Sequence, residues 1–167
     1  MICNIERAAL AALVSMFLQS VSAAAQVPEA IAAPQGAIKL LEVHAEGAQI
    51  YECKTAADGK LAWQFREPIA TLMVQGKTAG RHYAGPAWEL SDGSAVTGKV
   101  VAKAAGAAPG DIPLLRLDAV DRKGSGQLSG ITVIQRIGTK GGAAEGACTE
   151  AGAFLSVPYS ATYVFLK

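Results

Sequence analysis

The chain has 167 residues, of which 51% are hydrophobic and 17% charged, and its formal net charge is +1. This length fits one domain with one core, because domains most often have about 100–150 residues. Fifteen Lys and Arg residues balance fourteen Asp and Glu residues, and the longest basic feature is the pair Arg122-Lys123. The clustered basic face typical of nucleic-acid binding is absent, so nucleic acid is excluded as a partner.

The first 25 residues have the pattern of a cleavable signal peptide. A short polar start with one cation, an apolar run over 8–18 and small residues over 21–25 follow one another. The apolar run is shorter than the about 20 residues that a membrane span needs. We therefore predict an extracytoplasmic protein, periplasmic or secreted, with no membrane span after cleavage behind Ala23 or Ala25. An uncleaved anchor is the alternative, against which the alanine-rich end of the segment argues.

Two cysteines, Cys53 and Cys148, remain when Cys3 in the signal peptide is set aside. In an oxidising compartment an even pair indicates one disulfide. Closing a loop of about 95 residues would contribute on the order of 4 to 5 kcal/mol in the chain-entropy model. Two buried free thiols are the alternative. The spacing suits neither a redox CxxC motif nor a zinc knuckle, and we expect no metal and no cofactor.

The part of the chain after residue 25 is predicted to be an extended lead-in over 26–37, followed by an all-β domain over 38–167. Short apolar runs are separated by Gly, Asp-Gly and Pro about every ten residues, which is typical of an antiparallel β-sandwich or flattened barrel. We expect about 8–10 short strands and little helix. The lead-in either docks on this domain or trails from it.

In chain order, the first two strands are expected over 38–44 and 48–54, joined by a turn at 45–47 where Gly47 supplies positive φ. After Asp58-Gly59 a strand over 61–66 is expected to stop at Pro68, before another over 69–74. A hairpin-like segment covers 82–89, and further strands are expected over 94–103, 114–121, 131–137 and 157–165. The last has the clearest alternation, with Tyr159, Tyr163 and Phe165 on one face.

The densest group of chemically active side chains lies in the hairpin-like segment and the turn after it: His82, Tyr83, Trp88, Glu89 and Asp92. An imidazole, two carboxylates and two aromatic rings could form an acid/base site, or a platform on which a sugar or another flat ligand stacks. A packed corner is the alternative. In it Trp88 and Tyr83 lie in the core, His82 bonds to the backbone and Glu89 faces solvent.

Gln135 and Arg136 interrupt an otherwise apolar strand, so one of them is a buried polar group that needs a partner. If Arg136 faces inward, pairing with Glu52 or Glu89 is expected, because a lone buried charge is costly. If it faces outward, its aliphatic stem covers the sheet. Metal binding by His44 and His82 with one carboxylate is formally available, but two unrelated surface histidines are the favoured interpretation.

Several blocks of the sequence resemble the domain-of-unknown-function family numbered 3455. They are Glu46-Gly47-Ala48-Gln49-Ile50-Tyr51-Glu52-Cys53, His82-Tyr83-Ala84-Gly85-Pro86-Ala87-Trp88-Glu89 with Asp92-Gly93-Ser94, Val133-Ile134-Gln135-Arg136-Ile137 with Gly141-Gly142, and Val157-Pro158-Tyr159-Ser160-Ala161. The resemblance implies export and a single domain of this size. It transfers no catalytic residue.

Together these features predict a periplasmic or secreted binding or envelope-interaction module. Its ligand is open, with a carbohydrate or an envelope component as the classes considered. The candidate ligand-binding residues are His82, Tyr83, Trp88, Glu89, Asp92 and Arg136. The alternative is a small extracytoplasmic enzyme that uses His82 with Glu89 or Asp92 as acid and base on an envelope or extracellular polymer.

Overall fold

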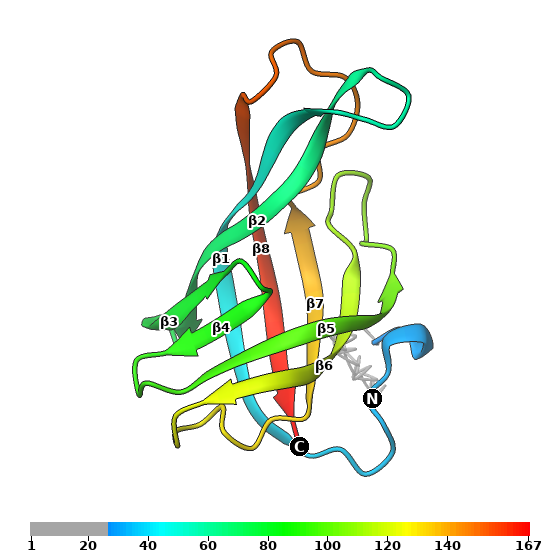
Figure 1. The fold of residues 1–167 in the computed structure, drawn as a ribbon. Helices are drawn as coiled ribbons and strands as arrows, with labels where there is room; N and C mark the ends of the chain where they lie inside the picture. The colour runs from blue at the N-terminus through cyan, green and yellow to red at the C-terminus, as the bar shows by residue number, and fades with distance from the viewer. Residues whose placement is uncertain (1–26) are drawn as a thin grey trace, which may run out of the picture.

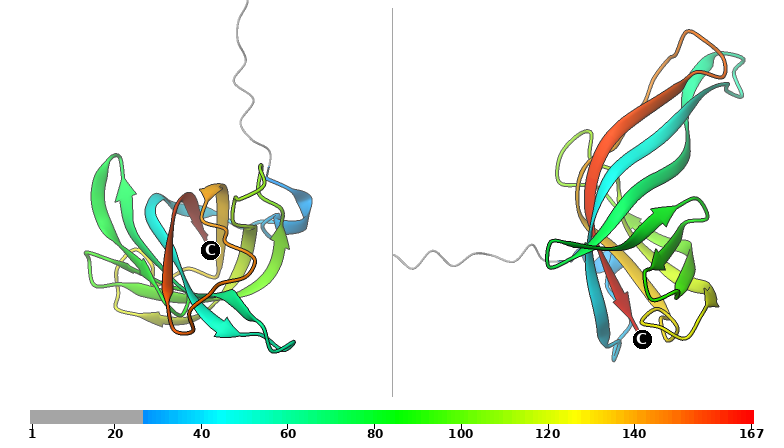
Figure 2. Two further views of the ribbon diagram at one scale, coloured as in Figure 1. Left: turned by 90° about the horizontal axis from the view of Figure 1, so that it is seen from above. Right: turned by 90° about the vertical axis from the view of Figure 1, so that its left-hand side faces the viewer.

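The alternating segments form eight antiparallel strands that follow one another around a closed barrel in chain order (Figure 1). A computed structural model describes residues 27–167, so the predicted signal peptide lies outside the described residues. β8 pairs with β1 and closes the ring, which Figure 2 shows from above. The strands are β1 (Lys39–Thr55), β2 (Leu61–Val74), β3 (Lys77–Tyr83), β4 (Ala87–Leu90), β5 (Ala95–Ala104), β6 (Leu114–Lys123), β7 (Val133–Gly141) and β8 (Phe154–Leu166).

The predicted all-β fold is confirmed, but the turn predicted at 45–47 is wrong. β1 runs unbroken through 17 residues, and Gly47 pairs with Ala70 on one side and with Tyr159 on the other. A Cβ at Gly47 would lie 2.0 Å from the carbonyl oxygen of Ile69. The glycine therefore permits a close approach of β2 to β1 and does not turn the chain.

The predicted strand end at Pro68 is also wrong, because Pro68 lies inside the 14-residue strand β2, opposite Gln49. The pairing of β1 with β2 changes register between Ile50 and Tyr51, one residue further along β1. Proline lacks a backbone N–H and is tolerated beside such a bulge, where ladder hydrogen bonds are already interrupted. As a result β1 and β2 are longer than the short strands expected from the sequence.

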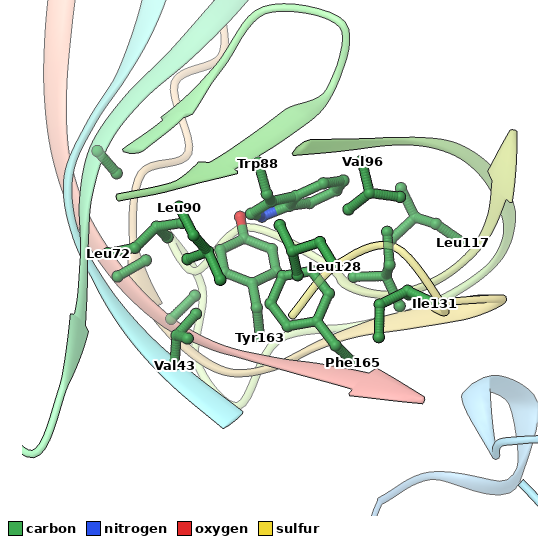
Figure 3. Close-up of a cluster of buried hydrophobic side chains, with 14 of the residues drawn as sticks. Val43, Leu72, Trp88, Leu90, Val96, Leu117, Leu128, Ile131, Tyr163 and Phe165 are labelled. Carbon is green, nitrogen blue, oxygen red and sulfur yellow. The ribbon is translucent and has the colours of Figure 1, made fainter. Parts of the chain in front are cut away.

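One end of the barrel is filled by aromatic side chains and closed by the loop between β6 and β7 (Figure 3). The Trp88 ring packs edge-on against Tyr163 and Phe165, with centroid distances of 5.1 and 6.0 Å. Leu128 and Ile131 of the loop are fully buried beside them. This end of the barrel is therefore occupied by core side chains.

The predicted disulfide is confirmed: Cys53 at the end of β1 is bonded to Cys148 in the β7–β8 connection, with their Cα atoms 5.9 Å apart. The backbone N–H of Gly152 also donates to the carbonyl of Cys53. β1, β2 and β8 extend beyond the other strands at the top of Figure 1. The disulfide therefore anchors the long connection to this extension.

The lead-in packs on the outside of the barrel through a short 3-10 helix, η1 (Glu29–Ile31). Ile31 is fully buried, and its carbonyl accepts a hydrogen bond of 2.7 Å from the side chain of Gln135. Arg116 donates to the carbonyl of Ala32 at 2.9 Å. Gln135 is thus the more buried residue of the pair Gln135-Arg136, and the lead-in supplies its partner. No helix within 27–167 combines the length and apolar character needed to cross a membrane.

Candidate functional site at the barrel mouth

A cavity of about 340 Å³, here called the mouth cavity, is bounded by β1, β2, the β3–β4 turn, β5, β6 and β7. β3 and β4 have seven and four residues, compared with fourteen in β2. The barrel wall is therefore shorter at β3 and β4 than at β2. Small-molecule sites typically occupy about 300–1,000 Å³, and the mouth of a β-barrel is one of their recurring places.

Apolar side chains form much of the cavity wall. Phe65 and Val100 remain 54% and 45% exposed, so they lie at its solvent edge. The other apolar side chains of the wall with more than one side-chain carbon are Pro68, Pro86 and Leu115. Such a wall favours the apolar part of a ligand.

The inner end of the cavity reaches His82, which is only 2% exposed. Its Nδ1 lies 2.8 Å from the carbonyl oxygen of Ala87. Because a carbonyl oxygen only accepts hydrogen bonds, Nδ1 is the protonated nitrogen. Burial lowers the pKa of His82 to about 4; the Ala87 carbonyl opposes this shift, and the Arg136 charge adds to it. At neutral pH the ring is uncharged, and Nε2 is an acceptor.

Arg136 also lines the mouth cavity, from β7. Across the sheet it is paired with Leu115 of β6 and Tyr163 of β8, and directly paired residues point to the same face. Tyr163 is a core residue, so Arg136 faces inward. Its Nε and Nη2 donate to the carbonyl of Pro113 at 3.0 and 2.8 Å.

The carboxylate partners considered for an inward Arg136 are engaged elsewhere. Glu52 forms an ion pair with Lys54 at 2.9 Å, and Glu89 forms one with Arg81 at the same distance. Within residues 27–167 no acidic side chain lies within ion-pair distance of Arg136. The cavity therefore contains a positive charge that the described protein does not neutralise.

Several buried polar atoms have no well-aligned hydrogen-bond partner in the described part of the chain. Inside the barrel these include Gln49 Nε2, Trp88 Nε1 and the hydroxyl oxygens of Tyr159 and Tyr163. Gln49 lines the mouth cavity, and the two tyrosines share the inner face of β8. Burial raises the pKa of both tyrosines, and the positive charge of Arg136 opposes this in both. The pKa of Tyr159 is also lowered by its contact with Gln49, and that of Tyr163 by its contacts with Tyr159 and Arg136. Gln49 and the two hydroxyls therefore lie beside one another next to Arg136.

The structure places Tyr83 and Glu89 on the outer face, away from this cluster. The hydroxyl of Tyr83 donates to Glu89 Oε2 at 3.1 Å, and Arg81 Nη2 donates to the same oxygen at 2.9 Å. The Arg81 contact, followed by that of Tyr83, holds the pKa of Glu89 below its usual range. His82 and Trp88, one residue along each strand, point inward instead.

Asp92 lies in the turn between β4 and β5, where it ties two loops together. Its carboxylate accepts hydrogen bonds from the hydroxyl of Ser94 at 2.6 Å, the N–H of Ser94 at 2.8 Å and the N–H of Gln127 at 2.8 Å. These contacts, led by the Ser94 hydroxyl, lower the pKa of Asp92. The structure therefore brings His82 together with Trp88 and Arg136, but not with Glu89 or Asp92.

The second histidine of the domain, His44, is on the exterior. Its Nε2 lies 3.1 Å from a carboxylate oxygen of Glu46, and both side chains are largely exposed. His82, in contrast, is inside the barrel. In the described range 27–167, no three His, Cys, Asp or Glu side chains are grouped as metal ligands would be.

Sequence reasoning did not single out Gln49, Tyr159 or Tyr163 as site residues. A signal for Gln49 is present, because it is the polar member of an inward series that also contains Val43, Ala45 and Tyr51. The tyrosines were expected on the core face of the last strand. Their hydroxyl groups can be assigned to the site only when the fold places them beside Gln49 and Arg136, which come from other strands.

Comparison with known proteins gives one family. The family described as "Protein of unknown function (DUF3455)" matches residues 34–167, a range that includes the whole barrel. No curated protein and no solved structure matches the chain. The description of the family assigns no chemistry to any residue of the mouth cavity.

Proposed function

Because the chain belongs to the DUF3455 family, whose description names no activity, we propose its function from the barrel: an extracytoplasmic binding module that holds a small ligand in the mouth cavity. The observation that carries this proposal is a cavity of about 340 Å³ that extends from exposed Phe65 to buried Gln49 and His82. An apolar wall with a few convergent polar groups at depth is the usual composition of a ligand site.

The opposite end of the barrel is closed, which supports the mouth as the entrance for the ligand. Leu128 and Ile131 close that end and are fully buried against the aromatic core. A barrel of eight strands has an interior that side chains fill or that holds one small ligand. Here the aromatic side chains fill one end, and the mouth cavity takes up space at the other.

An extracytoplasmic location is supported by two features that are independent of the cavity. The disulfide between Cys53 and Cys148 suits an oxidising compartment, since cytosolic thiols are kept reduced. The first 25 residues have the signal-peptide pattern.

Acid/base catalysis by His82 with Glu89 or Asp92 has less support than binding. The protonated nitrogen of His82 is held by a backbone carbonyl, and its pKa of about 4 keeps the ring neutral. Glu89 and Asp92 are bonded to partners outside the cavity. The mouth cavity instead presents fixed donors and an apolar wall, which suits recognition.

The proposal is tested by a small panel of probes: indole, 3-phenylpropan-1-ol, octanoate, glucose and N-acetylglucosamine. Binding is followed by chemical-shift changes of the protein, with the Trp88 indole N–H as a reporter at the inner end. A Val100→Trp variant should fill the rim of the cavity and abolish binding. Val120→Trp is the matched control, because Val120 is exposed on β6 and does not line the cavity.

We expect at least one probe to shift the resonances of the cavity-lining residues in the wild-type protein and in Val120→Trp, but not in Val100→Trp. Equal binding by Val100→Trp and the wild type would place the ligand elsewhere and reject the mouth cavity. The absence of shifts at the cavity with every probe would reject the binding function.

A further inference from the structure

We infer that the ligand of the mouth cavity is a small organic acid, with its carboxylate among Arg136, Gln49 and the two buried tyrosine hydroxyls and its apolar body against the rim. This inference rests on the proposed binding function and specifies its ligand class. It is carried by donors that converge inside the barrel around Arg136, which has no carboxylate partner within residues 27–167.

Gln49 Nε2 and the hydroxyls of Tyr159 and Tyr163 contact one another and Arg136, but within residues 27–167 none of them makes a well-aligned hydrogen bond. Of the three residues, Gln49 lines the cavity. An unmet buried polar group costs about 1–3 kcal/mol, and this cluster contains no carboxylate that would accept from its donors. A carboxylate offers two oxygens with about four acceptor positions, which matches this set of donors.

Arg136 faces the cavity and donates to the carbonyl of Pro113. It also contacts the Tyr163 hydroxyl, and neither partner is an anion. Arg66, the other cation of the wall, is already paired with Glu67 at 3.3 Å. No Asp or Glu is among the described residues that line the cavity. An anionic group is therefore favoured over a neutral or cationic one.

The rim of the cavity is apolar. Phe65 of β2, Pro86 of the β3–β4 turn and Val100 of β5 form it. A cavity of about 340 Å³ is near the lower end of the range for ligand sites. A compact acid with one aromatic ring or a short alkyl chain fits these dimensions and this apolar lining.

The experiment uses two matched pairs of probes that differ only in the head group: 3-phenylpropionate with 3-phenylpropan-1-ol, and octanoate with octan-1-ol. Affinities are measured by titration calorimetry at pH 7, where both acids are ionised, and the site is located by protein chemical shifts. We expect each acid to bind about ten- to a hundredfold more tightly than its alcohol, the range for charged hydrogen bonds.

Two variants assign the preference to the cluster. Arg136→Gln should remove the preference for the acid, whereas Arg81→Gln should keep it, because Arg81 has the same charge but lies outside the barrel, bonded to Glu89. Tyr163→Phe should weaken acid binding about three- to tenfold, by one hydrogen bond. Without ligand, Tyr163→Phe should be at least as stable as the wild type, because it removes a buried hydroxyl that makes no well-aligned hydrogen bond. A merely structural role of this hydroxyl would give the opposite result.

The outcomes separate this inference from the function on which it rests. Equal affinity for acid and alcohol at the mouth cavity would overturn the acid while leaving a ligand-binding cavity in place. Preserved acid preference in Arg136→Gln, or unchanged acid affinity in Tyr163→Phe, would overturn the role of the cluster. No shifts at the cavity with any of the four probes would overturn the acid, and no shifts with indole, glucose and N-acetylglucosamine either would overturn the binding function as well.

Discussion

His82 and Trp88 are direct cross-strand neighbours of β3 and β4, and their rings stack in parallel, with centroids 4.5 Å apart and planes 8° from parallel. The stack lies inside the barrel and is completed by the Tyr163 ring, 4.9 Å from the imidazole. Stacking on an indole and bonding to the Ala87 carbonyl fix the orientation of the imidazole. The inner end of the mouth cavity is therefore built on a rigid aromatic group.

The buried imidazole predicts a pH-dependent stability. The pKa of His82 is about 4 in the folded protein and 6.5 when unperturbed, so the unfolded chain binds the proton more readily. The stability that the neutral ring allows is present above pH 6.5 and is lost as the pH falls toward 4. Across this window the loss should reach about 3 kcal/mol, at about 1.4 kcal/mol for each pKa unit. Urea unfolding at a series of pH values measures it.

A His82→Asn variant should flatten this pH dependence, because the amide keeps a donor for Ala87 but does not titrate. His44→Asn is the control and should retain the wild-type slope, since His44 is on the surface. A slope between pH 4 and 6.5 that persists in His82→Asn would show that another group is responsible.

Asp92 is expected to stabilise the closed end of the barrel. Asp92→Ala removes the acceptor for Ser94 and for the Gln127 N–H, and we expect a loss of about 1–3 kcal/mol in the free energy of unfolding at pH 7. Because the pKa of Asp92 is lowered in the folded protein, its contribution is lost as the pH falls below about 4, the ordinary value of an aspartate. The gap between variant and wild type should therefore narrow in acid. Asp118→Ala, at an exposed position of β6, should change little at either pH.

Gly47 is predicted to be intolerant of any side chain. In Gly47→Ala the new Cβ would meet backbone atoms, at 2.0 Å from Ile69 O and 2.5 Å from the Ala70 Cα, which cannot move without separating β1 from β2. We expect a loss of 3 kcal/mol or more, at or above the upper end of about 1–3 kcal/mol for overpacking, or failure to fold. Gly130→Ala is the control, because its nearest atom would be the end of Lys167 at 3.9 Å. Denaturant midpoints that are equal for the two variants would contradict the close approach.

The disulfide is predicted to contribute about 2–5 kcal/mol to stability, the usual range for a native bridge. It closes a separation of 95 residues and ties the long β7–β8 connection to the end of β1. Guanidinium unfolding with and without a reductant measures this contribution. A Cys53→Ser, Cys148→Ser double variant should match the reduced wild-type protein and should not respond to the reductant. A wild-type midpoint that the reductant leaves unchanged would argue against this contribution.

Much of the fold follows from local alternation. β8 was predictable because Tyr159, Ala161 and Tyr163 recur every second residue among polar neighbours, and a strand places such residues on one face. The turn predicted at 45–47 and the strand end predicted at Pro68 were wrong because they depend on the partner strand. Glycine and proline are common in turns, but here Gly47 allows close packing of β1 and β2, and Pro68 lies beside a bulge in their pairing.

The sequence by itself determined an all-β chain, the core face of its clearest strand and one cysteine pair, because these depend on residue type and on a period of two. Tertiary structure alone decided that Gln135 faces the lead-in while Arg136 faces the cavity, since either side of a strand can be buried. It also brought Arg136 together with Gln49 and Tyr163 from separate strands. Alternation specifies which residues share a face of one strand, whereas closure of the barrel specifies which faces meet.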